Sequence, residues 1–167
     1  MTLERLTPWF LVAVAVAALS TALTAQIMFD KEPCILCLFQ RVPYVVTALL
    51  ALLTLKLPTG SSVIPLIIVL CALTYLTGSG IAIYHVGVEQ HWWISACTGS
   101  TADLSFENLR AALSAKPAKS CDDVDWTLFG FSMASYNVVF SAAMAAISLL
   151  AARVIRKNHE PKKSDPV

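Results

Sequence analysis

The sequence predicts an all-α integral membrane protein, a four-transmembrane-helix bundle with a long external loop. Of its 167 residues, 57% are hydrophobic and only 14% are charged, whereas a soluble domain is roughly 45–50% apolar and about 25% charged. The apolar residues are gathered in four long stretches. The formal net charge is +1, so the chain lacks the basic character of a nucleic-acid-binding protein, and we expect no nucleic-acid partner.

Four spans make up a single membrane domain over residues 1–167. They cover about residues 9–29, 35–57, 63–86 and 128–152. A hydrocarbon core of roughly 30 Å needs about 20 helical residues, and each stretch reaches that length. Because lipid cannot hydrogen-bond the backbone, each stretch is expected to be a helix. The alternative, four buried helices of a soluble core, would rarely repeat such lengths.

The first stretch could instead be a secretory signal peptide, since Arg5 precedes an apolar run. The run is longer than the roughly 7–15 residues usual in signal peptides. The best cleavage site, ending at Ala25, has Leu23 where a small side chain is expected. We therefore expect a membrane helix here.

The distribution of basic residues predicts the orientation. Four helices place both termini on one side, which collects seven lysines and arginines: Arg5, Lys56, Arg153, Arg156, Lys157, Lys162 and Lys163. The other side has four: Lys31, Arg110, Lys116 and Lys119, with Arg41 at the border. The positive-inside rule then favours cytoplasmic N- and C-termini. The external loop, residues 87–127, would be periplasmic, and the basic tail, residues 153–167, is expected to be disordered in the cytoplasm.

Two features of the external loop suggest contact with the membrane surface. Phe106, Leu109 and Leu113 recur at helical spacing, which predicts a short interfacial helix. Before it, His91-Trp92-Trp93 are typical of aromatic residues at headgroup level. We interpret them as a clamp that holds the loop to membrane lipid.

Four of the five cysteines fall on the predicted external face: Cys34, Cys37, Cys97 and Cys121. An even number in an oxidising compartment indicates two disulfides. The CxxC pair, Cys34 and Cys37, has redox spacing. A structural bridge that closes so small a loop would stabilise the chain little, so we expect this pair to exchange. Cys71 lies mid-membrane and is expected to pack as a small apolar residue.

The position of the CxxC pair favours a reactive thiolate. Pro33 precedes Cys34 and is suited to the first turn of a helix, where backbone dipoles stabilise a sulfur anion. Arg41 lies four residues after Cys37, on the same predicted helical face. It could stabilise that anion and donate hydrogen bonds to a ligand carbonyl. The alternative is an arginine that extends to lipid headgroups.

Cys97 and Cys121 lie on the loop, 24 positions apart. They could form a static disulfide, or they could exchange with the CxxC pair. A four-cysteine zinc site is a third interpretation, but zinc ribbons combine two CxxC units and this chain has one.

The combination of these motifs resembles the DsbB family of quinone-dependent disulfide-bond oxidoreductases over most of the chain. CxxC with an arginine four residues later, at the head of the second of four spans, is more specific than CxxC alone. The residues that carry the resemblance are 33–37, 40–44, 84–89, 97, 121–123, 126, 130 and 132–133.

The resemblance implies a membrane thiol oxidase of the bacterial inner membrane. It would re-oxidise a DsbA-like periplasmic oxidase of thioredoxin fold, which attacks Cys97. Cys121 would then exchange with Cys34, leaving Cys37 as a thiolate against a quinone with Arg41 beside it. The electrons would enter the membrane quinone pool, as ubiquinol or menaquinol.

Histidine 85 is a further candidate for the quinone site on this resemblance. His85 directly follows Tyr84 at the end of the third span. Glu89 and His91 compete for that role, and a hydrogen-bonded interfacial histidine is the alternative.

Two other functions remain open on the sequence. A vitamin K epoxide reductase-like protein also combines a CxxC with loop cysteines, but its CxxC lies in the last helix and its loop pair comes earlier. The second alternative is a non-enzymatic membrane subunit with structural or metal-binding cysteines. Bound zinc without an exchangeable disulfide would favour it.

Overall fold

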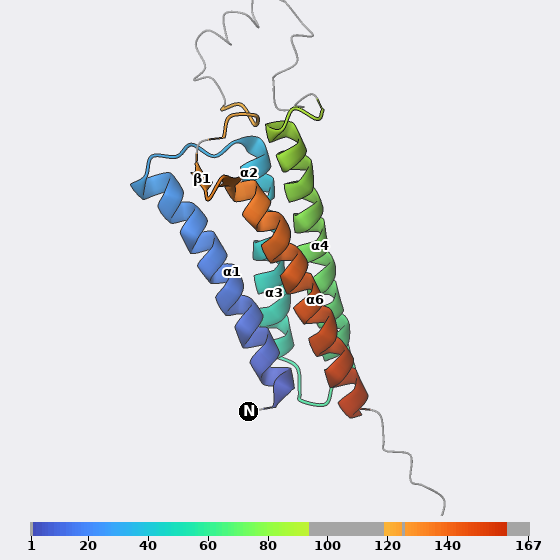
Figure 1. The fold of residues 1–167 in the computed structure, drawn as a ribbon. Coiled ribbons are helices and arrows are strands. Elements are labelled where there is room, and N and C mark those ends of the chain that lie inside the picture. Colours follow the sequence, from blue (N-terminus) through green and yellow to red (C-terminus); the bar gives the residue numbers. More distant parts are fainter. Residues whose placement is uncertain (1, 94–118, 125, 160–167) are drawn as a thin grey trace, which may run out of the picture.

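A computed structural model of the chain describes residues 2–93, 119–124 and 126–159, and these residues form a bundle of four long helical spans (Figure 1). The helices are α1 (Leu3–Met28), α2 (Ile35–Phe39), α3 (Val42–Leu55), α4 (Val63–Glu89) and α6 (Met133–His159). Helices α2 and α3 together make one span, Ile35–Leu55, and all four spans are long and apolar enough to cross a membrane. The predicted all-α, four-span membrane fold is confirmed.

The core of the bundle is formed mainly by α3, α4 and α6. Helix α4 packs along α6, and α3 packs between α1 and α4. The largest buried cluster joins Tyr44, Ala51, Cys71, Tyr75, Met144 and their neighbours from α1. Cys71 is fully buried in this cluster, as expected for a small apolar residue. Gly78 permits the close approach of α3, since a Cβ there would lie 3.2 Å from the Pro43 side chain.

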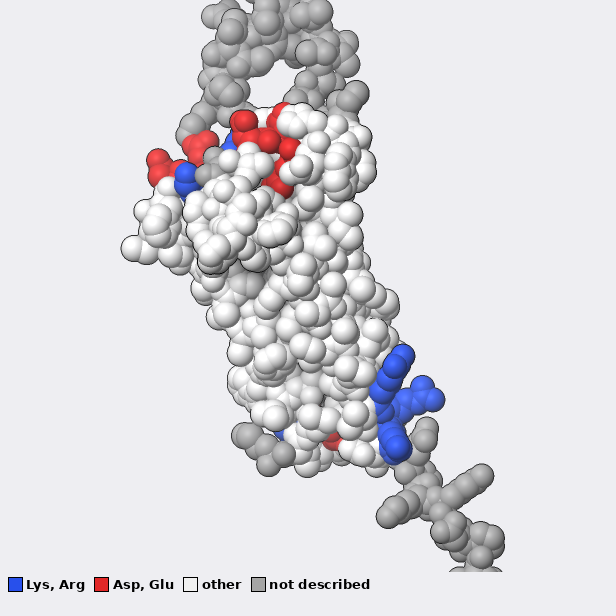
Figure 2. All heavy atoms as spheres, viewed as in Figure 1, with Lys and Arg blue, Asp and Glu red and all other residues white. Residues whose placement is uncertain are grey.

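The outer surface of the bundle is apolar, as a lipid-facing surface must be. Figure 2 shows a wide band of described residues without charged side chains on this face. Basic side chains gather at one end of the band, and the C-terminal part of α6 carries Arg153, Arg156 and Lys157. Acidic side chains gather at the other. We call the end that carries Cys34 and Cys121 the cysteine end, and the opposite one the tail end.

At the tail end, two side chains of α1 hold the bundle together. Arg5 donates from Nη1 to the Leu55 carbonyl at 2.5 Å and from Nη2 to the Leu57 carbonyl at 3.1 Å. Glu4 accepts a hydrogen bond from the Gly60 backbone N–H at 2.8 Å and contacts His159 of α6. Three of the four spans are thereby joined.

The last span differs from its predicted bounds at both ends. Residues 127–132 form a small antiparallel hairpin, β1 (Thr127–Leu128) with β2 (Phe131–Ser132), so α6 begins at Met133. The turn residues Phe129 and Gly130 have φ of 51° and 84°, and this left-handed pair breaks the helical pattern. At the other end α6 continues to His159, so the prediction of disorder from residue 153 is wrong for 153–159.

The basic side chains of that segment explain its helicity, because cations near a helix C-terminus complement its dipole. Residues 160–167 lie outside the described residues. So does the predicted interfacial helix with Phe106, Leu109 and Leu113.

Candidate redox site

The CxxC pair lies where the sequence predicts, at the start of the second span. Cys34 is the N-cap of α2, with φ −69° and ψ 167°, and its Sγ accepts a hydrogen bond from the Cys37 backbone N–H at 3.2 Å. Helix α2 has only five residues, so the anion-stabilising group is this local N–H rather than a long helix dipole. Cys34 is buried and Cys37 is half-buried.

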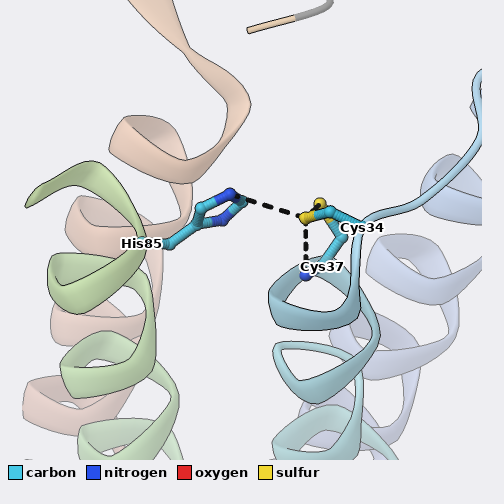
Figure 3. A group of neighbouring side chains, drawn as sticks. All are labelled: Cys34, Cys37 and His85. Atoms are coloured by element: carbon cyan, nitrogen blue, oxygen red, sulfur yellow. Dashed lines mark hydrogen bonds between the residues drawn. The ribbon is translucent and has the colours of Figure 1, made fainter. Parts of the chain in front are cut away.

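The two thiols face each other and a histidine from a neighbouring helix. The Sγ atoms of Cys34 and Cys37 are 2.7 Å apart, and both cysteines are free. Nε2 of His85, on α4, lies 3.6 Å from Cys34 Sγ (Figure 3). The three side chains therefore form one hydrogen-bonded group that joins α2 and α4.

The hydrogen bonds in this group make the Cys34 thiol more acidic than a free cysteine. The hydrogen bond with the Cys37 thiol is the main reason that the pKa of the Cys34 thiol is lowered, to about 4. The His85 side chain and the Cys37 backbone N–H lower this pKa further, and burial acts in the opposite direction. In the free dithiol the structure favours the anion on Cys34. The thiolate that the family resemblance implies on Cys37 would belong to a different state, in which Cys34 is bonded to Cys121.

Cys121 lies in the same buried cluster as the CxxC pair. Cys34, Leu36, Val88 and Cys121 form this cluster, and Cys37 packs against it. Cys121 is 1% exposed and takes part in a disulfide. Cys97, the other predicted loop cysteine, lies outside the described residues. Three of the four candidate catalytic cysteines are thus brought together.

His85 is buried, 5% exposed, and both of its ring nitrogens face polar groups. Nδ1 lies 2.7 Å from Nε2 of Gln40. Nε2 lies 3.8 Å from Oε1 of Glu89. The Glu89 carboxylate in turn accepts a hydrogen bond from the Ser132 hydroxyl at 2.5 Å. The competing candidate His91 is largely exposed and lies 3.8 Å from Asp122 instead.

Arg41 lies at the break between α2 and α3, and its side chain contacts α1. Its Nη1 donates to Oε1 of Gln26, on α1, at 2.9 Å. The backbone stays in the right-handed helical region at Gln40 and Arg41, and the guanidinium is directed to the neighbouring helix. Among the described contacts, His85 and not Arg41 is the side chain that reaches the sulfur of Cys34.

A cavity of about 690 Å³ lies beside the thiols. Small side chains of α1, including Ala18, Ala22 and Ala25, form part of its wall. Its polar lining includes groups from every span: Gln26, Cys34, Cys37, Gln40, Arg41, Tyr44, His85, Glu89 and Asn137. A cavity of this size, mostly apolar and with a few convergent polar groups, is typical of a small-molecule site.

Asn137 was not anticipated from the sequence as a site residue. Its side chain donates to Oε1 of Gln40 at 2.6 Å and so belongs to the polar lining. A polar amide within an otherwise apolar span is by itself a functional candidate, and that signal could have identified it.

The described residues do not assemble the four ligands of a structural zinc site. Ligand atoms of Cys34, Cys37 and His85 lie within 4.8 Å of one another. A structural zinc ion takes four protein ligands, and Cys121 is engaged in a disulfide. Among the described residues, the four-cysteine zinc site is therefore not formed.

Comparison with known proteins decides the family. The family model described as disulfide bond formation protein DsbB matches residues 4–151. The chain belongs to the DsbB family. It is 33% identical over 141 residues to disulfide bond formation protein B of Xylella fastidiosa strain Temecula1, which covers 79% of this chain and 80% of that protein. The protein of the same name from Xanthomonas campestris pv. campestris strain 8004 is also 33% identical, covering 80% and 81%.

Membership of the DsbB family, together with the four spans, makes the chain a multi-pass membrane protein of disulfide-bond formation. Disulfide oxidoreductase chemistry fits the CxxC group described above. A third relative, disulfide bond formation protein B of Dechloromonas aromatica, is 29% identical over 137 residues. The resemblance inferred from the motifs is therefore confirmed, and the vitamin K epoxide reductase-like alternative is set aside.

Proposed function

We propose that this DsbB-family protein re-oxidises a reduced periplasmic oxidase of thioredoxin fold, a DsbA-like protein, and passes the electrons to a membrane quinone. The observation that carries the proposal is the buried cluster of Cys34, Cys121 and their neighbours, beside a cavity that reaches the CxxC pair. A dithiol–disulfide exchange needs the sulfurs of both pairs in one place, and an electron acceptor within reach of one pair.

The proposed exchange proceeds in two balanced steps. The partner's thiolate attacks Cys97 of a Cys97–Cys121 disulfide, and the partner leaves as a disulfide while Cys97 and Cys121 become thiols. Cys121 then attacks Cys34 of the Cys34–Cys37 disulfide, and Cys97 closes the loop pair again. Cys34 and Cys37 are left as thiols with two electrons more than the disulfide. Free Cys34 and Cys37 beside a bonded Cys121 are consistent with the state after this second step.

The cavity residues fit a quinone. A quinone supplies a two-electron acceptor that takes up two protons, and its carbonyl oxygens require hydrogen-bond donors. The Arg41 guanidinium has five N–H donors and directs one of them to Gln26. The apolar wall of α1 suits a lipid-soluble ring, and the position at the membrane edge suits a molecule of the lipid phase. Arg41 would donate a hydrogen bond to a carbonyl oxygen of the quinone. His85 would lie next to the thiols of Cys34 and Cys37.

The chain's own residues supply the remaining chemistry. The hydrogen bonds to Cys34 favour its anionic form, and a thiolate is the reactive species in exchange. Nε2 of His85 lies 3.6 Å from Cys34 Sγ, close enough for a proton to pass between the two atoms. The burial of Cys34 and Cys121 limits the access of water to these two side chains.

The proposed location is the bacterial inner membrane, with both termini in the cytoplasm and the cysteine end in the periplasm. The exposed basic side chains at the end of α6 support this orientation, because lysine and arginine favour the cytoplasmic side. Cysteine accessibility to a membrane-impermeant reagent in intact cells would test it.

The function itself is tested with purified protein, a reduced thioredoxin-fold partner, and ubiquinone or menaquinone. We expect partner oxidation to depend on quinone, and to be abolished in Cys34→Ser and in Cys37→Ser. Cys71→Ala is the matched control, since Cys71 is free but lies in the core away from the cavity. Full turnover in either CxxC variant, or oxidation that ignores quinone, would refute the proposal.

A further inference from the structure

A line of polar side chains crosses the bundle from His85 to α6, and the proposed electron path leaves it without a role. Gln40 Nε2 lies 2.7 Å from His85 Nδ1, and Gln40 Oε1 accepts from Asn137 Nδ2 at 2.6 Å. Asn137 Oδ1 accepts from the hydroxyls of Tyr44, at 2.5 Å, and Ser141, at 3.0 Å. We call Gln40 and Asn137 the amide chain.

The amide chain has one direction of donors and acceptors in the structure, from α6 toward His85. In the structure Asn137 directs its Oδ1 to the two hydroxyls and its NH₂ group to Gln40. Gln40 then presents its oxygen to Asn137 and its NH₂ group to His85. An NH₂ group only donates hydrogen bonds, so the nitrogen that it faces must accept.

The consequence falls on the proton of His85. Nδ1 accepts from Gln40 and therefore carries no proton. A neutral imidazole has one N–H, which must be on Nε2. That atom lies 3.6 Å from Cys34 Sγ and 3.8 Å from Oε1 of Glu89, and both of these groups are acceptors for an N–H.

We propose that Gln40 and Asn137 are positioning residues that hold His85 as the neutral tautomer with its proton on Nε2. The Nε2–H of His85 then faces the sulfur of Cys34, and the backbone of Cys121 is a further hydrogen-bond partner of the ring. In the exchange this N–H would stabilise the Cys34 thiolate when it is released, and this role rests on the proposed function. The position of the proton on His85 is independent of the proposed function.

The same direction of the chain opposes metal binding by the group. Coordination through Nε2 needs its lone pair, and therefore a proton on Nδ1. With Gln40 donating to Nδ1, the lone pair faces away from the thiols. The amide chain thus keeps Cys34, Cys37 and His85 available for redox chemistry.

Nitrogen-15 NMR of the histidine side chains tests the inference in the reduced full-length protein, without quinone or partner. The chain has 3 histidines, and His91→Gln and His159→Gln variants assign the signals. We expect His85 to show an unprotonated Nδ1 and a protonated Nε2. In Asn137→Asp the carboxylate can only accept, so it should draw the NH₂ of Gln40 and turn the Gln40 oxygen to His85. The His85 proton should then move to Nδ1.

A second variant and a control complete the design. Gln40→Glu presents a carboxylate directly to Nδ1 and should also place a proton there, which keeps the test decisive if Asn137→Asp does not fold. Thr47→Val is the control, since it removes a buried hydroxyl pair with Thr74 (2.7 Å) outside the chain. It should leave the tautomer unchanged.

A proton on Nδ1 of wild-type His85, alone or together with one on Nε2, overturns the inference. So does an Nε2 tautomer that persists in both acidic variants. If wild-type protein shows the expected tautomer but reduces no quinone, the proposed function fails while this inference stands.

Discussion

The guanidinium of Arg41 donates to the side-chain oxygen of Gln26 at 2.9 Å and so ties the break between α2 and α3 to α1. Both side chains line the cavity beside the thiols. The sequence predicted two roles for Arg41, to stabilise a sulfur anion and to donate hydrogen bonds to a ligand carbonyl. In the structure Arg41 is part of the cavity wall, which favours the second role.

Arg41→Ala is therefore expected to weaken quinone binding rather than to abolish thiol chemistry. A hydrogen bond from a charged group contributes about 1.5–3 kcal/mol, so the apparent KM for quinone should rise by about tenfold to a hundredfold. Steady-state kinetics over a range of quinone concentrations would measure this. Lys56→Ala is the control, because Lys56 lies at the tail end of the same span. An unchanged KM would mean that Arg41 only anchors the helices.

Cys34 should remain a thiolate well into the acidic range. Its pKa is lowered to about 4, chiefly by the hydrogen bond with Cys37 and also by His85, whereas a free cysteine has a pKa of about 8.5. The anion is present above the folded-state pKa and is lost as pH falls through it. The thiolate absorbance of the reduced protein, taken as a difference from Cys34→Ser, should therefore stay constant between about pH 8 and pH 6.

The histidine contributes to that stabilisation, so His85→Ala should move the midpoint of the same titration upward. Cys71→Ala, a change at a buried cysteine outside the site, should not move it. A wild-type midpoint above pH 7 would contradict the hydrogen-bonding arrangement around Cys34.

The fold was predictable because lipid imposes a strong and simple pattern on the sequence. Four apolar stretches identified four spans, and the CxxC spacing with Pro33 located the redox pair. The turn at Gln40 and Arg41 was predictable in part, because Pro43 lies in the first turn of α3 and has no N–H for the Phe39 carbonyl. The direction of the Arg41 side chain was not predictable, because it depends on a contact with Gln26 of another helix.

The polar interior of the site could be predicted only in part. His85 was a candidate, but its partners on other helices depend on how the helices rotate against one another. Asn137 meets Gln40 across 97 positions of sequence, and no local periodicity records such a contact. Motif similarity could name the family without revealing which groups orient the histidine.

Gly87 allows Trp93 to fold back on the end of α4. A Cβ at Gly87 would lie 1.9 Å from Cζ2 of Trp93, whose Nε1 donates to the Tyr84 carbonyl at 3.1 Å. Gly87→Ala should therefore displace the indole, with a change in tryptophan fluorescence and a lower melting temperature. Gly80→Ala is the matched control on the same helix, since a Cβ there has no neighbour within 4 Å. It should be neutral or slightly stabilising, because alanine favours helix over glycine by about 1 kcal/mol. Equal behaviour of the two variants would contradict the contact.

Arg5 should stabilise the tail end without affecting catalysis. Its guanidinium donates to the carbonyls of Leu55 and Leu57, near the C-terminus of α3, where cations complement the helix dipole. Arg5→Leu removes both bonds and should lower the thermal midpoint by several degrees, while the KM for quinone stays unchanged. Thermal unfolding in detergent measures the first effect. A loss of quinone affinity would instead indicate that the two ends of the bundle are coupled.

The packing of Cys121 against Cys34 predicts which cysteines can be trapped together. In Cys37→Ser, the remaining thiol of Cys34 can attack the disulfide that contains Cys121, but it cannot complete the CxxC bridge. A Cys34–Cys121 disulfide should therefore accumulate, with one thiol released from the loop for each bond formed. Peptide mapping under non-reducing conditions would identify it. In Cys34→Ser, the corresponding bond from Cys37 should be much rarer, since Cys37 packs at the edge of the cluster. A bond from Cys34 to Cys97 instead would show that the loop delivers its other sulfur, and the proposed order of exchange would be wrong.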